Sequence, residues 1–313
     1  MKLAFVVDPL ESLKAYKDSS VAMMREAWRR GHEVHALEAH EMFLREGKVR
    51  AAALRLELFA DDHAWYRAGE PHEAVLSGFD AVLMRKDPPF DQQYYYATLL
   101  LDRVVAEGGR VVNDPRALRD WNEKTSILRF PDLTPPTLVT SEMRHVHAFI
   151  DEHRDVVLKK LEGMGGTMIF RVRGDDPNRN VIVETITDNG GRTMMAQRYI
   201  PEIANGDKRV LVIDGKPFSH CLARIPMQGE TRGNLAAGGT GVARAITARD
   251  REIGEAVGRE LVKAGIVFAG LDVIGDWLTE VNVTSPTCIV EIAEQTGNNA
   301  AVDVVDVLEK TRR

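Results

Sequence analysis

Short apolar segments alternate with helix-forming segments over the first 120 residues, and this alternation constrains the fold more than any other feature. One of the helices can begin at a capping residue, Asp18, and is ended by Gly31. The expected strands are residues 3–7, 33–37, 81–84 and 110–112, and the expected helices are residues 18–30 and 92–107. Repeated strand–helix–strand units predict an α/β fold in which helices cover a mostly parallel sheet.

The pattern changes after Trp121. A helix is expected at residues 141–153, and strands are expected at 156–159, 168–172, 208–213 and 216–225. The segment from Pro226 to Gly241 is rich in glycine and has little periodicity. An irregular loop of that length in a compact enzyme is usually a lid or a binding loop. A helix at 248–264 and two strands around Gly275 and Asp276 follow it.

Composition and charge exclude several classes of protein. The chain has 313 residues, enough for two or three modules with a sizeable core. Its formal net charge of -6 argues against dedicated nucleic-acid binding, which needs a basic surface. Two cysteines, Cys221 and Cys288, cannot form a disulfide framework, and no apolar run approaches the roughly 20 residues of a membrane span. We therefore expect a cytoplasmic protein with neither nucleic-acid nor membrane partners.

A glycine-rich loop, residues 163–166, lies between two expected strands, directly after Lys159. Glycines allow backbone N–H groups to approach phosphates closely. The loop is neither a Rossmann fingerprint, because Met168 stands where a glycine is needed, nor a P-loop. Lys159 and Lys124 are candidate phosphate ligands. A plain β-turn and solvated surface lysines are the alternatives.

Asp272, Glu280 and Asn282 fall on the two strands around Gly275. Their oxygen atoms suit Mg²⁺, which takes few protein ligands, although carboxylates facing solvent would give the same pattern. A three-residue loop, 275–277, would place position 272 opposite 280 and position 270 opposite 282. Facing carboxylates repel by up to roughly 1 kcal/mol in an ordinary sheet, and a bound cation would turn this repulsion into coordination.

Two arginines and an aspartate on the preceding strands are further candidates. Arg209 and Arg224 alternate with apolar residues, and they either bind a carboxylate or phosphate or face outward from a half-buried strand. Asp207, beside Gly206, is a turn residue or a ribose ligand. Cys288 has no histidine nearby in sequence, which favours a small core or helix-start residue over a nucleophile.

Several stretches together resemble the bacterial glutathione synthetases of the ATP-grasp superfamily, in the order of that family and over nearly the whole chain. They are KDSS (17–20), MRKDPPFD (84–91), NEK (122–124), GMGG (163–166), GDKRVLVIDG (206–215), LARIP (222–226), GETRGNLAAGG (229–239) and LTEVNVTSPTCI (278–289). The resemblance implies an N-terminal α/β substrate domain (1–122), an ATP-grasp small lobe (123–200) and a C-terminal lobe (201–313) with a lid loop (226–241). It also implies a homo-oligomer, a tetramer in this family.

The same resemblance implies roles for individual residues. The implied ATP ligands are Lys124, Lys159, Gly163, Gly165, Gly166, Gln197, Tyr199, Ile200 and Asp207. The implied metal ligands, for Mg²⁺ or else Mn²⁺, are Asp272, Glu280 and Asn282. Arg209 and Arg224 would be catalytic. The implied substrate ligands are Ser19, Arg85, Arg232, Asn234 and Ser285.

The activity implied is ATP-dependent ligation of glycine to γ-glutamylcysteine through an acyl phosphate. Phosphoryl transfer needs positioning and charge neutralisation, which Mg²⁺, lysine and arginine supply. An acyl phosphate hydrolyses in water, so a closing lid is expected. One alternative is another ATP-grasp ligase, such as a D-alanine–D-alanine ligase or a glutamate-adding enzyme. The other is a nucleotide-binding regulatory protein, like the synapsins, that keeps the fold without turnover.

Overall fold

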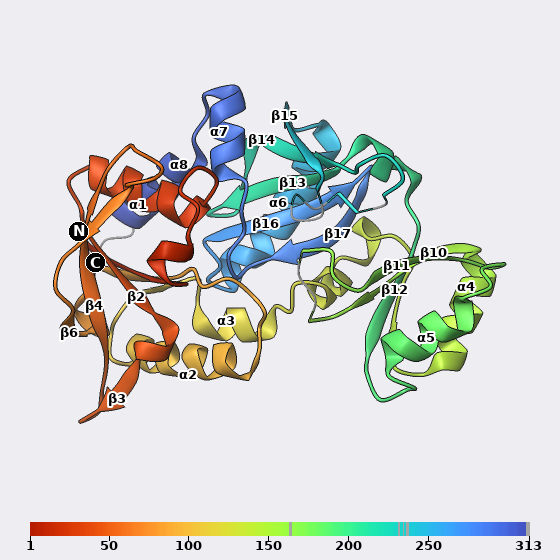
Figure 1. Ribbon diagram of the computed structural model, residues 1–313, viewed down its shortest axis with the longest axis horizontal. Helices are drawn as coiled ribbons and strands as arrows, with labels where there is room; N and C mark the ends of the chain where they lie inside the picture. Colours follow the sequence, from red (N-terminus) through yellow and green to blue (C-terminus); the bar gives the residue numbers. More distant parts are fainter. Residues whose placement is uncertain (163–164, 231, 234, 236–237, 311–313) are drawn as a thin grey trace.

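The computed structural model describes residues 1–313 except 163–164, 231, 234, 236–237 and 311–313. It contains three sheets, which follow one another along the long axis of the molecule (Figure 1). The strands are β1 (Lys2–Val7), β2 (Glu33–Glu38), β3 (Phe43–Arg45), β4 (Lys48–Leu58), β5 (Tyr66–Ala68), β6 (His72–Val75), β7 (Ala81–Met84), β8 (Val111–Val112), β9 (Thr137–Thr140), β10 (Asp155–Lys160), β11 (Ile169–Arg173), β12 (Met194–Arg198), β13 (Asp207–Ile213), β14 (Lys216–Ile225), β15 (Thr240–Ala245), β16 (Phe268–Ile274) and β17 (Trp277–Asn282). The α-helices are α1 (Ser19–Arg29), α2 (Gln92–Ala106), α3 (Pro115–Asp120), α4 (Met143–His153), α5 (Arg179–Thr187), α6 (Ala248–Lys263), α7 (Ile289–Thr296) and α8 (Ala300–Lys310).

The N-terminal sheet has the strand order β3-β4-β2-β1-β7-β8, and β5 and β6 also pair with β4. Strands β2, β1, β7 and β8 are parallel, as the strand–helix–strand pattern predicts, whereas β4 is antiparallel to β2. Five of the six residues of β1 are buried, which is typical of a parallel strand covered on both faces. The α/β fold class is confirmed.

Helix α1 packs against this sheet and against helix α8. Its expected cap is present, because the Asp18 carboxylate accepts hydrogen bonds from the backbone N–H of Ser20 and Val21. Helix α8 packs against α1, so this C-terminal helix lies beside the domain in which the chain begins (Figure 1). Arg30 joins the two helices through ion pairs of 2.7 Å to Asp306 and 2.9 Å to Glu309.

The small lobe is defined here as the four-stranded antiparallel sheet β11-β10-β12-β9 with helices α4 and α5. Its separate core includes Val146 and Ile150 from α4 and Val183 and Ile186 from α5. The large lobe is the five-stranded antiparallel sheet β15-β14-β13-β16-β17 with helices α6 and α7. Figure 1 shows the small lobe at the opposite end of the molecule from the N-terminal sheet, with the large lobe between them.

The hairpin β16–β17 differs from the expectation in its loop. Ile274 pairs with Trp277, so the loop has two residues, Gly275 and Asp276, and the expected three-residue loop is wrong. Gly275 has a φ of 56°, in the left-handed region that two-residue hairpin loops require.

A β-bulge in the same hairpin nevertheless produces the expected register. Thr279 is an extra residue on β17, so Asp272 still faces Glu280, and Gly270 faces Asn282. The Thr279 hydroxyl donates a 3.1 Å hydrogen bond to the carbonyl of Asp272 where the ladder is interrupted. The bulge, and not the length of the loop, places the three candidate metal ligands together.

Within the described residues, no helix combines the length and the apolar character that crossing a membrane requires.

Candidate active site

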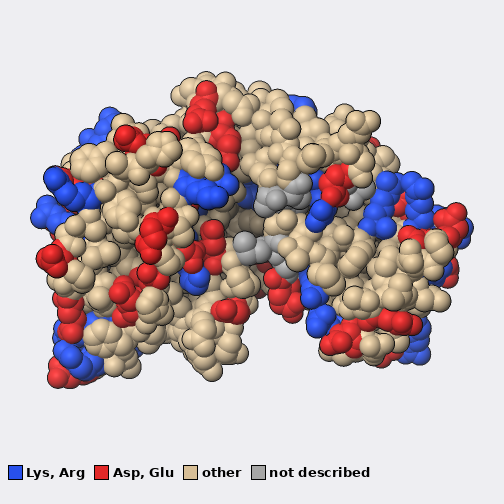
Figure 2. Space-filling view, in the orientation of Figure 1, with Lys and Arg blue, Asp and Glu red and all other residues tan. Residues whose placement is uncertain are grey.

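A cavity of about 330 Å³ lies between the two lobes, with the loop after β7 of the N-terminal domain at its edge. The face shown in Figure 2 is indented between the N-terminal part on the left and the small lobe on the right. The expected site residues that line the cavity are Lys124, Lys159, Gly165, Gly166, Gln197, Tyr199, Ile200, Asp207, Arg209, Arg224, Arg232, Asp272, Glu280, Asn282 and Ser285. Two further expected residues, Gly163 and Asn234, lie outside the described residues.

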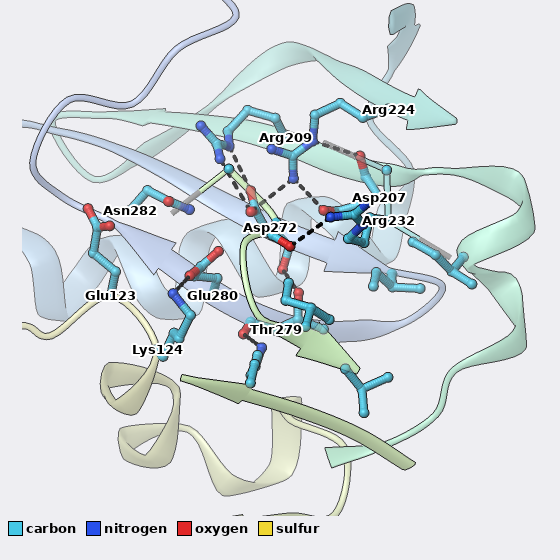
Figure 3. A pocket seen from close by; sticks show the side chains of 18 of the residues that line it. Glu123, Lys124, Asp207, Arg209, Arg224, Arg232, Asp272, Thr279, Glu280 and Asn282 are labelled. Atoms are coloured by element: carbon cyan, nitrogen blue, oxygen red, sulfur yellow. Dashed lines mark hydrogen bonds and ion pairs between the residues drawn. The ribbon is translucent and has the colours of Figure 1, made fainter. Parts of the chain in front are cut away.

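Two arginines converge on one carboxylate at the floor of the cavity (Figure 3). Arg209 Nε and Nη2 lie 2.6 and 3.2 Å from the two oxygens of Asp272, and Arg224 Nη2 lies 2.9 Å from Asp272 Oδ2. All three side chains are buried. Burial opposes ionisation of Asp272, but the two guanidiniums outweigh it and hold the pKa of this carboxyl well below its usual range. Arg209 and Arg224 therefore do not face outward from a half-buried strand.

Arg224 also pairs with Asp207 on the neighbouring strand. Burial raises the pKa of the Asp207 carboxyl to about 6, although Arg224 opposes this shift. The second oxygen, Oδ1, is buried and accepts no hydrogen bond from the described residues. A buried acceptor without a donor costs free energy, so this oxygen fits a ligand hydroxyl.

Both lysines line the cavity, and Figure 3 shows Lys124 on the opposite side of Asp272 from Arg209 and Arg224. Lys124 Nζ is 2.8 Å from Glu280 Oε1, and this carboxylate outweighs burial and raises the pKa of Lys124. Lys159 Nζ donates to the carbonyl of Thr279 at 3.3 Å, and none of the described carboxylates forms an ion pair with it. Burial lowers the pKa of Lys159 to about 8. Neither lysine is a solvated surface residue.

The glycine loop of the small lobe meets the loop after β14 above the cavity. Gly165 and Gly166 have φ angles of 62° and 82°, which favour glycine. Arg232 Nη1 donates to the carbonyl of Gly166 at 3.2 Å, and its Nη2 pairs with Glu230 at 2.6 Å. These two loops therefore already touch across the opening.

The small-lobe end of the cavity is more apolar. Ile200 and the ring of Tyr199 line it, and Gln197 Nε2 donates to Thr137 Oγ1 at 3.1 Å. The guanidinium of Arg171 lies over the ring of Tyr199, 3.5 Å from its centroid. Apolar side chains with hydrogen-bonding groups beside them suit an aromatic base.

Two of the expected substrate ligands lie behind the cavity wall. Ser19 Oγ accepts a hydrogen bond from the N–H of Ile289 at 3.2 Å, at the start of α7. Arg85 Nε donates to Ser20 Oγ and its Nη2 donates to the carbonyl of Pro286, both at 3.0 Å. Both residues are buried and support the segment 284–288. Their role as direct substrate ligands stays a prediction.

Three of the lining oxygens fit a hard divalent cation. Asn282 Nδ2 donates to the carbonyl of Gly270 at 3.1 Å, which leaves its side-chain oxygen available. Glu280 supplies a carboxylate beside it, and Asp272 faces Glu280 across the hairpin, although both of its oxygens are paired with arginine. Carboxylate and amide oxygens are the donors that Mg²⁺ and Mn²⁺ prefer. The described residues contain no group of three or more His, Cys, Asp or Glu side chains placed to hold a metal, so the set relies on Asn282.

Several lining residues were not expected from the sequence. They include Asp87, Pro88, Glu123, Thr279, Thr287 and Cys288. Glu123 and Thr287 lie in the same sequence motifs as the expected residues Lys124 and Ser285. Their position next to these residues is the feature of the sequence that could have identified them. Cys288 is buried at the residue before α7, in agreement with the expectation of a helix-start residue.

Comparisons with known proteins agree with this architecture. The family model "Prokaryotic glutathione synthetase, N-terminal domain" matches residues 1–119, and "Prokaryotic glutathione synthetase, ATP-grasp domain" matches residues 123–297. The chain is 54% identical to a glutathione synthetase of Nitrosomonas europaea, over 99% of this chain and 98% of that protein. It is 51% identical to a glutathione synthetase of Vibrio parahaemolyticus, over 99% and 98% of the two chains. The solved D-cycloserine synthetase DcsG has the same fold, with a TM-score of 0.69 at 15% identity over 100% of both chains. The chain belongs to the prokaryotic glutathione synthetase family of ATP-grasp ligases.

Proposed function

We propose that the chain ligates glycine to γ-glutamylcysteine at the expense of ATP, giving glutathione, ADP and phosphate. The observation that carries this proposal is the cavity itself, in a chain of this family. Its walls bring two buried lysines, two buried arginines and a row of carboxylate and amide oxygens into one space. Such a site suits phosphoryl transfer, in which the protein mainly positions the reactants and neutralises charge.

The reaction begins when the terminal carboxylate of γ-glutamylcysteine attacks the γ-phosphate, which yields an acyl phosphate and ADP. The amine of glycine then attacks the acyl carbon, and phosphate leaves as the peptide bond forms. Lys124 and Lys159 hold the phosphates, and Arg209 and Arg224 neutralise the charge on the carboxylate and the acyl phosphate. A bound Mg²⁺ or Mn²⁺, held by Glu280 and Asn282 with Asp272 beside them, lowers the negative charge of the phosphates.

The remaining contacts divide between nucleotide and dipeptide. Gln197, Tyr199 and Ile200 surround the adenine, and the unpaired oxygen of Asp207 accepts a ribose hydroxyl. The glycine loop, with Gly163, Gly165 and Gly166, covers the phosphates. Ser285, Arg232 and Asn234 face the dipeptide, and Ser19 and Arg85 shape that side from behind.

The domain organisation follows the same proposal. The substrate domain is residues 1–122, the small lobe 123–200 and the C-terminal lobe 201–313, with the loop 226–241 as a lid over the acyl phosphate. The contact between Arg232 and Gly166 supports a closing role for this loop. We place the enzyme in the cytoplasm, as a homotetramer, and its free cysteines, Cys221 and Cys288, suit a reducing compartment.

The first prediction tests the substrates. ADP release should require ATP, Mg²⁺, γ-glutamylcysteine and glycine together, with one ADP formed per peptide bond. A coupled ADP assay with each component omitted in turn measures this, together with mass spectrometry of the product. Equal ADP release with D-alanine alone would assign the chain to another ATP-grasp ligase, and nucleotide binding without turnover would indicate a regulatory protein.

The second prediction concerns Lys159 and pH. Because its pKa is about 8 in the free protein, this lysine is charged below that pH and loses its charge above it. Phosphate raises the pKa of the lysine, so ADP binding near pH 8 should take up a proton, and Kd should rise by up to about tenfold per pH unit above it. Calorimetry in two buffers that differ in ionisation enthalpy measures the uptake. The variant Lys159→Arg stays charged and should show none, and wild-type binding without proton uptake would contradict the prediction.

A further inference from the structure

Glu123 lies in the wall of the cavity, directly before Lys124. Its carboxylate Oε1 accepts three hydrogen bonds from the segment that follows β17. The donors are Val283 N at 3.0 Å, Thr284 N at 3.1 Å and Thr284 Oγ1 at 2.8 Å. The backbone carbonyl of Glu123 accepts a fourth, from Val281 N at 2.8 Å. A single residue therefore holds the chain on both sides of Asn282, and Figure 3 shows Glu123 on the same side of the site as Asn282.

The sheet itself does not supply these bonds. Strand β17 is the edge strand of the large lobe and ends at Asn282, so the backbone N–H groups beyond it have no partner in the ladder. Val283 and Thr284 are buried, and a buried donor left without a partner costs roughly 1 to 3 kcal/mol. Hydrogen bonds to a carboxylate are stronger than those to a neutral acceptor. Glu123 thus supplies the acceptor for these N–H groups, while Asn113 Nδ2 holds the carbonyl of Val283 from another direction at 2.8 Å.

Two consecutive residues contact the same short stretch of β17 and its continuation. Lys124 pairs with Glu280 at 2.8 Å, and Glu123 binds the residues on either side of Asn282. Glu123 therefore links the backbone next to Lys124 to the backbone on either side of Asn282. Immediately downstream, Ser285 and Thr287 line the cavity on the segment that Glu123 anchors.

We propose that Glu123 is a positioning residue, which holds the phosphate-binding Lys124 and the cation-binding Asn282 at a fixed spacing and presents the 284–287 segment to the substrate. The identity of the ligands in this statement rests on the proposed function. Glu123 need not touch a ligand, because its effect is transmitted through the four hydrogen bonds described above.

The experiment compares three variants with a matched control. Glu123→Ala removes the acceptor, Glu123→Gln keeps an oxygen in the same position, and Thr284→Val removes one donor of the three. The control is Glu107→Ala, because Glu107 is also buried and accepts hydrogen bonds from Val49 N at 3.1 Å and Ser77 Oγ at 3.0 Å, far from the cavity. The measurements are the Mg²⁺ concentration for half-maximal turnover, the affinity for ADP with and without Mg²⁺ by calorimetry, and Tm.

Glu123→Ala should raise the Mg²⁺ concentration for half-maximal turnover by about tenfold or more and weaken the Mg²⁺-dependent part of ADP binding, as the loss of an outer partner of a metal site does. Glu123→Gln should recover most of this loss, and Thr284→Val should show a smaller shift in the same direction. Glu107→Ala should lower Tm without changing either Mg²⁺ measurement.

The proposal is overturned if Glu123→Ala lowers Tm as the control does but keeps wild-type Mg²⁺ dependence and ADP binding. It is also overturned if Glu123→Gln is as impaired as Glu123→Ala. Should Glu123→Ala fail to fold, the absence of any shift in Thr284→Val overturns it instead. Failure of the wild-type protein to join γ-glutamylcysteine and glycine would count against the proposed function alone, since ADP and Mg²⁺ binding can still be measured.

Discussion

Replacing Glu280 with glutamine is expected to lower kcat/KM for MgATP by about 100-fold or more. Loss of an outer partner of a metal site costs about 10- to 100-fold, and Glu280 is proposed as a direct ligand, so its loss should cost at least as much. Of the two carboxylates among the proposed metal ligands, Glu280 is the one that is not paired with an arginine. Both oxygens of Asp272 contact Arg209 or Arg224. Glutamine keeps the shape of the side chain but replaces the charge with a neutral amide. The Mg²⁺ concentration needed for half-maximal turnover should rise in parallel, and a titration of activity against Mg²⁺ measures it.

The stability of this variant is a separate matter. The sequence alone predicts that Glu280→Gln costs little stability, because it removes the repulsion between two facing carboxylates when no metal is bound. In the structure, each carboxylate already has a cation, since Asp272 faces two arginines and Glu280 faces Lys124 at 2.8 Å. The free energy of unfolding without ligands should therefore fall by roughly 1.5 to 3 kcal/mol, the range for a hydrogen bond to a charged group.

A variant that keeps the charge separates these effects. Glu280→Asp retains a carboxylate on a shorter side chain, so it should keep more of the Mg²⁺ response than glutamine does. Urea unfolding of both variants without nucleotide or metal gives the stability change. If Glu280→Gln shows wild-type Mg²⁺ dependence, Glu280 is not a ligand of the cation.

The elements that the sequence predicts correctly are those with a strong local signal. The parallel strands β1, β2, β7 and β8 are short apolar runs between helices whose ends are marked by Asp18, Gly31 and Asp91. Such patterns act within about ten residues, so one sequence is sufficient to read them. The antiparallel strands β4, β5 and β6 lack this rhythm and were not predicted.

The hairpin β16–β17 shows what local reasoning cannot supply. The facing pair Asp272 and Glu280 was predicted correctly, but from a three-residue loop, whereas the structure has a two-residue loop and a bulge at Thr279. Both arrangements satisfy the same spacing in sequence. The pairing of Ile274 with Trp277 and the hydrogen bond from the Thr279 hydroxyl to the carbonyl of Asp272 distinguish them, and both depend on the folded hairpin.

Contacts between distant segments account for the other differences. Ser19 and Arg85 are expected as substrate ligands from their motifs, and this stays a prediction. The structure adds their hydrogen bonds to Ile289 and Pro286, 270 and 201 residues away, which the motifs do not indicate. Lys124 and Glu280 form an ion pair across 156 residues of sequence. Ion pairs between residues so far apart produce no periodic pattern in the sequence. Motifs can therefore identify a residue such as Lys124, but they do not show that its partner is Glu280.

Replacing Arg224 with methionine is expected to lower both activity and stability, and to make stability fall as pH rises. Arg224 is buried between Asp207 and Asp272. Among the described residues, its removal leaves Arg209 paired with Asp272 and leaves Asp207 without an ion-pair partner. Breaking a buried ion pair by removal of one partner costs about 3 to 5 kcal/mol. If Arg224 neutralises the acyl phosphate as proposed, loss of this cation should lower kcat by about 100-fold or more.

The pH dependence of the Arg224→Met variant follows from Asp207. Its pKa is already about 6 in the wild-type protein because it is buried, and loss of Arg224 removes the charge that opposes this shift. A carboxyl whose pKa is higher in the folded than in the unfolded state binds more protons when folded, so its contribution to stability diminishes as pH rises through the folded pKa. Urea unfolding at about pH 5.5 and about pH 8 should therefore show a larger loss of stability at the higher pH in Arg224→Met than in the wild type. The double variant Arg224→Met with Asp207→Asn should remove most of this extra pH dependence without restoring activity, because asparagine does not titrate. Equal stability of Arg224→Met at both pH values would show that Asp207 does not gain a proton when its arginine partner is lost.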